Sequence, residues 1–211
     1  MRAGRLLAVL ILLPAISAAQ DSWKATEEAA ARAGKAPQFD EAEKKLSANL
    51  KFAETLPAKD PRRPRTLFDL AEIYRAEGKH SEAFPLYERS FQIYTGLFGP
   101  EATEIADTLD GEAELYKSLN DYAHAEPMLL HALSIRQKLL HPGDPDIAQA
   151  ENDLGELCTA TGAFDKAEPL LEESLASRKT DPGAESADVA QSLEALGTLY
   201  SKSGRDTKLH V

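Results

Sequence analysis

The sequence predicts an all-α solenoid built from antiparallel helix pairs, and three observations predict it. First, the chain repeats itself every 42 residues, as at Tyr74, Tyr116, Cys158 and Tyr200. Second, apolar residues within each repeat recur at steps of three and four, the spacing of one helix face. Third, a small turn-forming residue interrupts each repeat near its middle. A helix pair of this kind buries its apolar face only against neighbouring pairs, which favours a stacked array.

The first segment, residues 1–19, is typical of a secretory signal peptide. Two arginines precede an apolar run from Leu6 to Ile16, and Ser17 to Ala19 are small residues that a signal peptidase accepts. The run is shorter than the roughly 20 residues that a helix needs to cross a bilayer. We therefore expect cleavage after Ala19 and an extracytoplasmic product, periplasmic or secreted, with no membrane span in the mature chain.

The composition excludes several function classes. With 211 residues, 43% of them hydrophobic and 28% charged, the chain has the composition of a folded, water-soluble protein. Its formal net charge of -11 argues against a nucleic-acid partner, because phosphates repel an acidic protein. Cys158 is the only cysteine, so neither an internal disulfide nor a cysteine-based zinc site is possible.

The repeat pattern divides the rest of the chain into six segments. They are a looser first helix pair at 20–63, three repeats at 64–105, 106–147 and 148–189, the first helix of an incomplete repeat at 190–204, and a non-repeat tail at 205–211. The looser pair begins near Trp23 and has Phe39 and Ala42 at an offset of 41 from the next copy. Its assignment therefore depends on fewer matching positions than the others.

Within a repeat, the residue types predict where each helix begins and ends. Gly78, Gly162 and Gly204 occupy the corner between the two helices, where a left-handed residue ends the first one. The prolines of the second helix, Pro85, Pro127 and Pro169, are expected in its first turn, where amides lack intrahelical acceptors. Asp144 is expected to cap the helix that starts at Pro145.

Small residues at equivalent positions predict close contact between the helices. They are Ala71, Ala113, Gly155 and Gly197 in the first helix and Ala83, Ala125 and Ala167 in the second. Aromatic residues beside them, such as Tyr74 and Phe164, would fill the remaining space.

The interior of the repeat resembles the tetratricopeptide repeat. The segment Leu196–Tyr200 has the form L-G-x-x-Y, with glycine four residues later, and the other copies place alanine five residues after this corner. The strings at Asp144–Ala148 and Ala167–Leu171 are similar to repeats of the kinesin light chain type, whose units run to 42 residues. The resemblance covers roughly residues 22–204. Departures include Cys158 in the tyrosine position, Asn120 in the glycine position, Glu112 where leucine is usual and Lys44 where proline is usual.

The resemblance implies a right-handed superhelix whose first helices line a concave groove for an extended peptide. The corresponding positions are Arg65, Phe68, Glu72, Arg75, Asp107, Asp110, Glu114, Lys117, Gln149, Asn152, Glu156, Thr159, Gln191, Glu194 and Thr198. In kinesin light chain-like repeats, an asparagine at the position of Asn152 holds the peptide backbone. The middle of the groove is acidic, so we expect a ligand with basic residues. The alternative is that these charges only solvate the helix faces.

Nothing in the sequence favours catalysis or a bound cofactor. His124 and His131 lie seven residues apart without a clear third metal ligand, and His80 occupies an aromatic core position. The acidic and proline-rich loop at residues 141–146 is explained by turns and capping. Cys158 is expected in the core, and no glycine-rich phosphate loop is present. We therefore expect neither an enzyme nor a metal or cofactor site.

The pattern stops after Gly204, so the second helix of the last repeat is missing from the sequence. We expect this to leave an uncovered side on Leu193, Leu196, Leu199 and Tyr200. A partner subunit could cover it, the chain could associate with itself, or the chain could be a truncated form of a longer protein.

The expected function is that of an exported, non-catalytic scaffold that binds a peptide or protein segment in the groove. Two alternatives remain open. One is a structural or assembly subunit of an envelope or secreted complex, and the other is an accessory domain of a larger protein.

Overall fold

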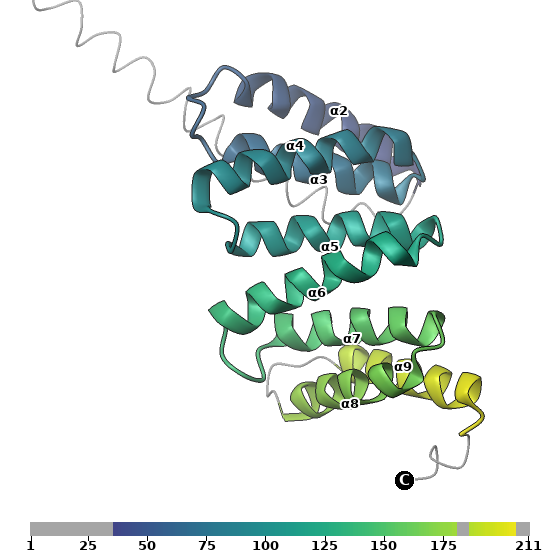
Figure 1. Cartoon of the computed structure of the whole chain (residues 1–211). Coiled ribbons are helices and arrows are strands. Elements are labelled where there is room, and N and C mark those ends of the chain that lie inside the picture. Colours follow the sequence, from purple (N-terminus) through teal and green to yellow (C-terminus); the bar gives the residue numbers. More distant parts are fainter. Residues whose placement is uncertain (1–35, 181–185, 206–211) are drawn as a thin grey trace, which may run out of the picture. The chain divides into compact units, whose positions relative to one another are not determined.

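The computed structural model describes residues 36–180 and 186–205, and this part of the chain contains eight α-helices and no strand (Figure 1). The helices are α2 (Ala36–Ala53), α3 (Arg62–Ala76), α4 (His80–Phe98), α5 (Thr103–Ser118), α6 (Tyr122–Leu139), α7 (Pro145–Ala160), α8 (Phe164–Thr180) and α9 (Ser186–Ser203). The predicted all-α helix-pair fold is confirmed. The predicted signal peptide, the helix expected near Trp23 and most of the tail lie outside the described residues. None of the described helices is long and apolar enough to cross a bilayer.

The chain divides into two compact units, Met1–Ile93 and Tyr94–Val211. In the first unit, α2 and α3 share a core that includes Ala42, Leu46, Leu70 and Ile73. Charged groups at the edge of this core support the same contact, because Glu43 of α2 accepts hydrogen bonds from Tyr74 (3.2 Å) and Lys79 (3.0 Å). The looser first repeat therefore contributes at least one helix that packs on the next repeat.

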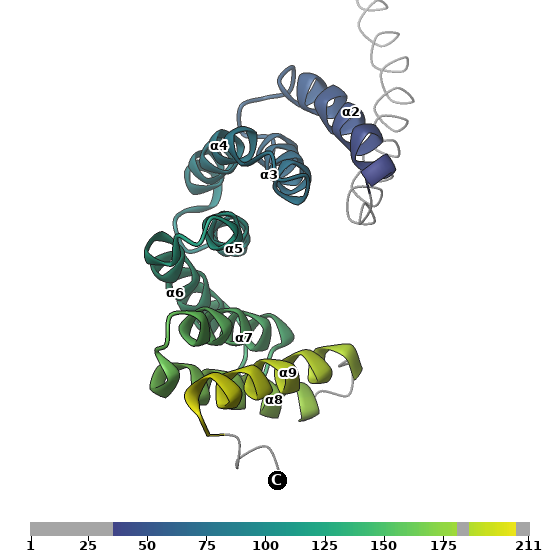
Figure 2. The ribbon, with the colours of Figure 1, turned by 90° about the vertical axis from the view of Figure 1, so that its right-hand side faces the viewer.

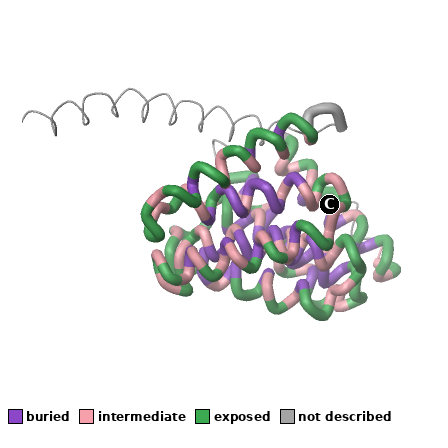
Figure 3. The backbone as a smooth tube through the Cα atoms, turned by 90° about the horizontal axis from the view of Figure 1, so that it is seen from above, coloured by how far each residue is buried: buried purple, intermediate pink, exposed green. Residues whose placement is uncertain are grey.

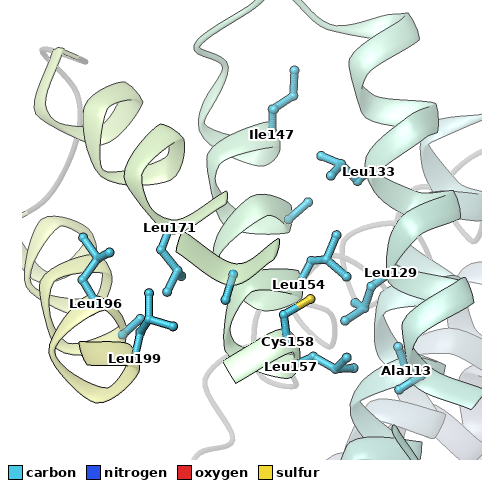
Figure 4. Packing of buried hydrophobic residues seen from close by; sticks show 14 of the residues in the cluster. Ala113, Leu129, Leu133, Ile147, Leu154, Leu157, Cys158, Leu171, Leu196 and Leu199 are labelled. Carbon is cyan, nitrogen blue, oxygen red and sulfur yellow. The ribbon is translucent and has the colours of Figure 1, made fainter. Parts of the chain in front are cut away.

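The second unit contains the antiparallel pairs α5/α6 and α7/α8, followed by α9. Figures 1 and 2 both show α9 lying beside α7 and α8. One continuous core joins these helices, with Leu129 of α6, Leu154 and Cys158 of α7, Leu171 of α8 and Leu199 of α9 (Figure 4). Buried and exposed stretches alternate along the backbone of the described helices (Figure 3). Within this unit, the pair α5/α6 thus buries its apolar face against α7/α8, and α7 and α8 bury theirs against α9, as the repeat predicts.

The corner residues that end the first helices α3, α5, α7 and α9 have the predicted left-handed backbone. The φ angle is +74° at Gly78, +80° at Gly162 and +69° at Gly204, and Asn120 adopts +59° at the equivalent position. At each corner, the next amide donates a hydrogen bond of 2.8–2.9 Å to the carbonyl five residues earlier, at Tyr74, Tyr116, Cys158 or Tyr200. This closure defines a Schellman motif, which explains why glycine and asparagine recur there.

The prediction for the three prolines is wrong by about one turn. Pro85, Pro127 and Pro169 lie inside α4, α6 and α8, each at the sixth helical residue. At that depth an amide would normally donate to the carbonyl four residues earlier, so each proline removes one helical hydrogen bond. The helices begin at the aromatic position of each repeat, His80, Tyr122 or Phe164, so a proline five residues later falls in the second turn.

Close helix contact is confirmed at Gly155. A Cβ atom on this residue would lie 2.6 Å from Cδ2 of Leu171, which is closer than packed carbon atoms allow. Ala113, Ala125 and Ala167 are fully buried in the same core. The predicted cap is also confirmed, because the Asp144 side chain accepts a 3.1 Å hydrogen bond from the Asp146 amide, with Pro145 at the first position of α7.

The uncovered apolar side expected on the last helix is largely absent. Leu196, Leu199 and Tyr200 are buried in the core of the second unit, and the Tyr200 hydroxyl donates to Glu168 at 3.3 Å. Only Leu193 is prominently exposed, at 49%. The expectation is wrong for the other three because α9 turns them toward α7 and α8.

Candidate functional site

In the second unit, the predicted groove positions lie on the first helices α5, α7 and α9. A buried arginine of the second helix forms ion pairs with two of the positions on α5. Arg136 of α6, only 7% exposed, forms ion pairs with Asp107 (2.9 Å) and Asp110 (2.5 Å). The negative charge of these two carboxylates on α5 is therefore partly neutralised by Arg136 of α6.

Arg178 of α8 has the equivalent role one repeat later. Its guanidinium donates to the Asp188 carbonyl at 2.7 Å, to Ser192 Oγ at 2.8 Å and to Gln191 Oε1 at 3.2 Å. It also donates to Gln149, so one arginine orders predicted groove positions on α7 and α9. Sequence reasoning missed both arginines, although their 42-residue separation was a signal that could have identified them.

Asn152 lies beneath the surface rather than on it. Its side chain is fully buried, and Nδ2 donates a 2.8 Å hydrogen bond to Glu156. Its Oδ1 atom is buried and has no hydrogen-bond partner among the described residues. A role for Asn152 in holding a ligand backbone stays a prediction. What the structure shows is an amide that orients the carboxylate of Glu156.

Three carboxylates, Glu114, Asp153 and Glu156, surround Lys117 in the predicted groove, and Asp110 lies close enough to Asp153 to repel it. We call these four carboxylates the acidic groove cluster. Lys117 forms an ion pair with Glu114, while Asp153 accepts a 2.8 Å hydrogen bond from Gln149. Asp153 was not among the predicted groove residues. It lies one residue after Asn152, at the edge of the same helix face.

Burial and mutual repulsion perturb two members of this cluster. Burial is the main cause that raises the pKa of Asp110 to about 6, because the attraction of Arg136 only partly offsets it. Burial likewise raises the pKa of Asp153 to about 7, with Lys117 opposing the shift and Glu114 adding to it. Burial thus makes both carboxyl groups harder to ionise than exposed ones, and a nearby cation would favour their charged forms.

A cavity of about 270 Å³ lies between α7 and α9, and we call it the groove cavity. Its lining includes five predicted positions, Glu156, Thr159, Gln191, Glu194 and Thr198, together with Ala195 and Lys202. These residues come from equivalent faces of two consecutive first helices. The structure thus brings together the part of the predicted site that lies on α7 and α9.

In the first unit, the predicted positions on α3 are engaged with one another and with α4. Phe68 packs edge-on against Tyr87 at 5.9 Å, and the Arg65 guanidinium lies 5.8 Å from the Phe68 ring. Glu72 pairs with Arg75 at 2.6 Å and accepts a hydrogen bond from the Tyr87 hydroxyl. These contacts stabilise the α3/α4 pair.

The described residues contain no group of three or more His, Cys, Asp or Glu side chains arranged to hold a metal ion. His124 stacks on Tyr116 at 5.1 Å between ring centres and lies 2.7 Å from an Asp121 oxygen. Burial raises the pKa of the Cys158 thiol, which disfavours the reactive thiolate. These residues are accounted for by packing and capping.

Comparison with known proteins agrees with this architecture. The family model described as "Tetratricopeptide repeat" matches residues 62–138 and 146–208. Among solved structures, BtubC (BKLC) from P. vanneervenii aligns with a TM-score of 0.75 at 24% identity, covering 92% of this chain and 85% of that chain. The nearly identical TPR-like repeats of a kinesin light chain sequence from P. anserina align with a TM-score of 0.73 at 24% identity, covering 88% and 89%. A search of curated protein sequences finds no significant match.

Two thirds of the chain match the family model, and the helix pairs, corners and core have the corresponding structure. Such repeats are typically non-catalytic scaffolds for protein–protein interaction. The chain belongs to the tetratricopeptide repeat family.

Proposed function

We propose that the groove of the second unit binds an extended peptide segment that carries lysine or arginine residues. The observation that carries this proposal is the groove cavity, which equivalent positions of α7 and α9 line together. A peptide that follows the first helices would meet the same kind of surface at each repeat. Polar side chains such as Gln191 and Thr198 offer hydrogen bonds to its backbone.

The preference for basic residues follows from the electrostatics of the acidic groove cluster. Burial is the main cause that raises the pKa values of Asp110 and Asp153, so their ionised forms are poorly solvated and would gain from a further cation. An ammonium or guanidinium group from the ligand would supply such a partner. Binding should therefore weaken as salt screens the attraction, with a Debye length of about 8 Å at physiological ionic strength.

Fluorescence anisotropy with labelled peptides of matched length tests the proposal. A lysine-rich peptide should bind more tightly than glutamate-rich or serine-rich peptides, and the difference should shrink between 50 and 500 mM salt. Glu156→Gln combined with Glu194→Gln should weaken binding by about tenfold, equivalent to 1.4 kcal/mol. Glu88→Gln is the matched control, because it removes an exposed carboxylate from α4 in the other unit. Equal affinity for the basic and acidic peptides would refute the charge preference.

A groove function is preferred to assembly through the last helix because only Leu193 of the four expected side chains is prominently exposed on α9.

We also propose export, on the basis of the signal-like pattern of residues 1–19. Mass spectrometry of the protein isolated from its native cells tests this. A mature chain that starts at Gln20 supports export, whereas an intact chain in the cytosolic fraction contradicts it.

A further inference from the structure

One position breaks the repeat in a way that the groove does not explain. Leu67, Leu109 and Leu193 are separated by multiples of 42 residues, and the third copy of this position holds Glu151 instead of leucine. Leu67 and Leu109 are buried, as expected for a core position of the first helix. A carboxylate has therefore taken the place of an apolar side chain at a position of this kind.

Glu151 is nevertheless buried. It is only 6% exposed, and its Oε2 atom has no hydrogen-bond partner among the described residues. Successive residues of a helix turn by about 100°, so Glu151 projects from nearly the opposite side of α7 to Glu156. The groove proposed above therefore makes no use of this carboxylate. An unpaired buried carboxylate is costly, and buried charges in proteins are normally paired.

A second cavity, of about 390 Å³, provides a place for the missing partner, and we call it the Glu151 cavity. It is bounded by the end of α6, the Pro142-Gly143 turn, α7 and α8. Glu151 and Glu173 are its two carboxylates, and Gln137 and Ser177 add neutral hydrogen-bonding groups. None of the described residues that line it is cationic. Its volume lies within the usual range for small-ligand sites, about 300–1,000 Å³.

The remaining lining is suited to the body of an amine rather than to a bare metal ion. Ile147 and Ala176 present apolar surface beside the carboxylates. A lysine side chain or a short alkylamine has the same combination, with methylene groups that bury against apolar atoms and a charged head that needs an oxygen partner. Two carboxylates with few further oxygen ligands do not provide the six to eight that calcium prefers.

We propose that the Glu151 cavity binds a primary ammonium or guanidinium group, with the Glu151 carboxylate as its ion-pair partner and Glu173 as a second negative charge at the site. The cation has two possible sources, a lysine or arginine side chain of a partner protein and a free small amine. In both cases the apolar chain lies along Ile147 and Ala176. The site is separate from the groove and does not depend on the function proposed for it.

Amide NMR spectroscopy of the full chain tests this directly, with n-butylammonium as the free amine and N-acetyl-lysine methylamide as the side-chain analogue. Saturable shifts are expected at Gly143, Ile147, Glu151 and Ala176, with a dissociation constant on the order of 1 mM for ligands of this size. Binding of only the lysine analogue points to a partner's side chain, and binding of only butylammonium points to a free amine. n-Pentanol, which has a similar shape without the charge, should bind at least tenfold more weakly.

Two variants separate this site from the groove. Glu151→Gln keeps the shape of the side chain and should weaken butylammonium binding at least tenfold, whereas the Glu156→Gln/Glu194→Gln protein should bind it as the wild type does. Circular dichroism checks that both proteins remain folded. The proposal is overturned if neither amine produces saturable shifts, if pentanol binds equally well, or if Glu151→Gln leaves affinity unchanged. Loss of peptide binding with retained amine binding would instead refute only the groove function.

Discussion

The buried carboxylate of Glu151 makes a quantitative prediction about stability and pH. Burial is the main cause that raises its pKa from 4.5 to about 7, and the nearby charge of Glu173 adds to the shift. Because the folded state holds this proton more tightly, between pH 4.5 and 7 it retains a proton that the unfolded chain has lost. The contribution of Glu151 to stability is therefore present below pH 4.5 and is lost as pH rises through about 7.

Replacing the residue by Gln removes this titration while keeping the side chain's size. The difference between a pKa of 4.5 and one of about 7 corresponds to about 3 kcal/mol, and water in the open cavity reduces this free energy. We therefore expect Glu151→Gln to raise the unfolding free energy by about 1–2 kcal/mol at pH 8 and to change it little at pH 4.5. Leucine, which restores the repeat, should add a further gain of about 1–2 kcal/mol at all pH values through apolar burial.

Urea denaturation followed by far-ultraviolet circular dichroism at pH 4.5, 6, 7 and 8 measures the difference between variant and wild type. Asp110 and Asp153, whose pKa values are also raised, titrate in both proteins, so their effects cancel in this difference. Glu173→Gln is the control for the second carboxylate of the cavity and should give a smaller effect. A stability difference between Glu151→Gln and wild type that is the same at pH 4.5 and 8 would refute the reasoning.

Three further substitutions test the packing and the buried charges. Ala167→Leu should lower the unfolding free energy by about 1–3 kcal/mol, because this fully buried residue adjoins the α7/α8 contact; an unchanged melting curve contradicts the packing. Arg136→Met should lower the unfolding free energy by about 1–3 kcal/mol at pH 8, where Asp110 is charged and loses its ion-pair partner. The loss should be smaller at pH 5, where Asp110 takes up a proton instead. Urea titrations at the two pH values measure this difference, and equal losses would count against the ion pair. Asn120→Gly should stabilise by up to about 1 kcal/mol, because glycine adopts a φ of +59° without strain; a lower melting temperature would contradict this.

The repeat itself was sufficient to predict the helix pairs, their corners and much of their core. Each of these features depends on interactions within a few residues or on contacts that recur in every copy. Gly162 ends α7 through its own backbone conformation, and Asp144 caps that helix through the amide two residues later. Gly155 and Leu171 meet because the repeat places a small and a large residue at facing positions.

Which polar side chains are buried, and which of them pair with one another, was decided only by the tertiary structure. Arg136 and Asp107 are 29 residues apart, and nothing local in either segment indicates that they pair. The same holds for the burial of Asn152 and for the covering of Leu196 and Tyr200, both of which depend on how closely neighbouring helices approach.

By itself, the sequence determined the family, the repeat and the helical faces, because period and local backbone preference are written into every copy. The tertiary structure decided which carboxylates are neutralised, which lack a partner and where cavities remain, because electrostatic free energy depends on distances and burial across helices. The inference about Glu151 needed both the sequence and the tertiary structure. Its place in a leucine position is visible in the sequence, and its unpaired carboxylate beside a cavity is visible only in the fold.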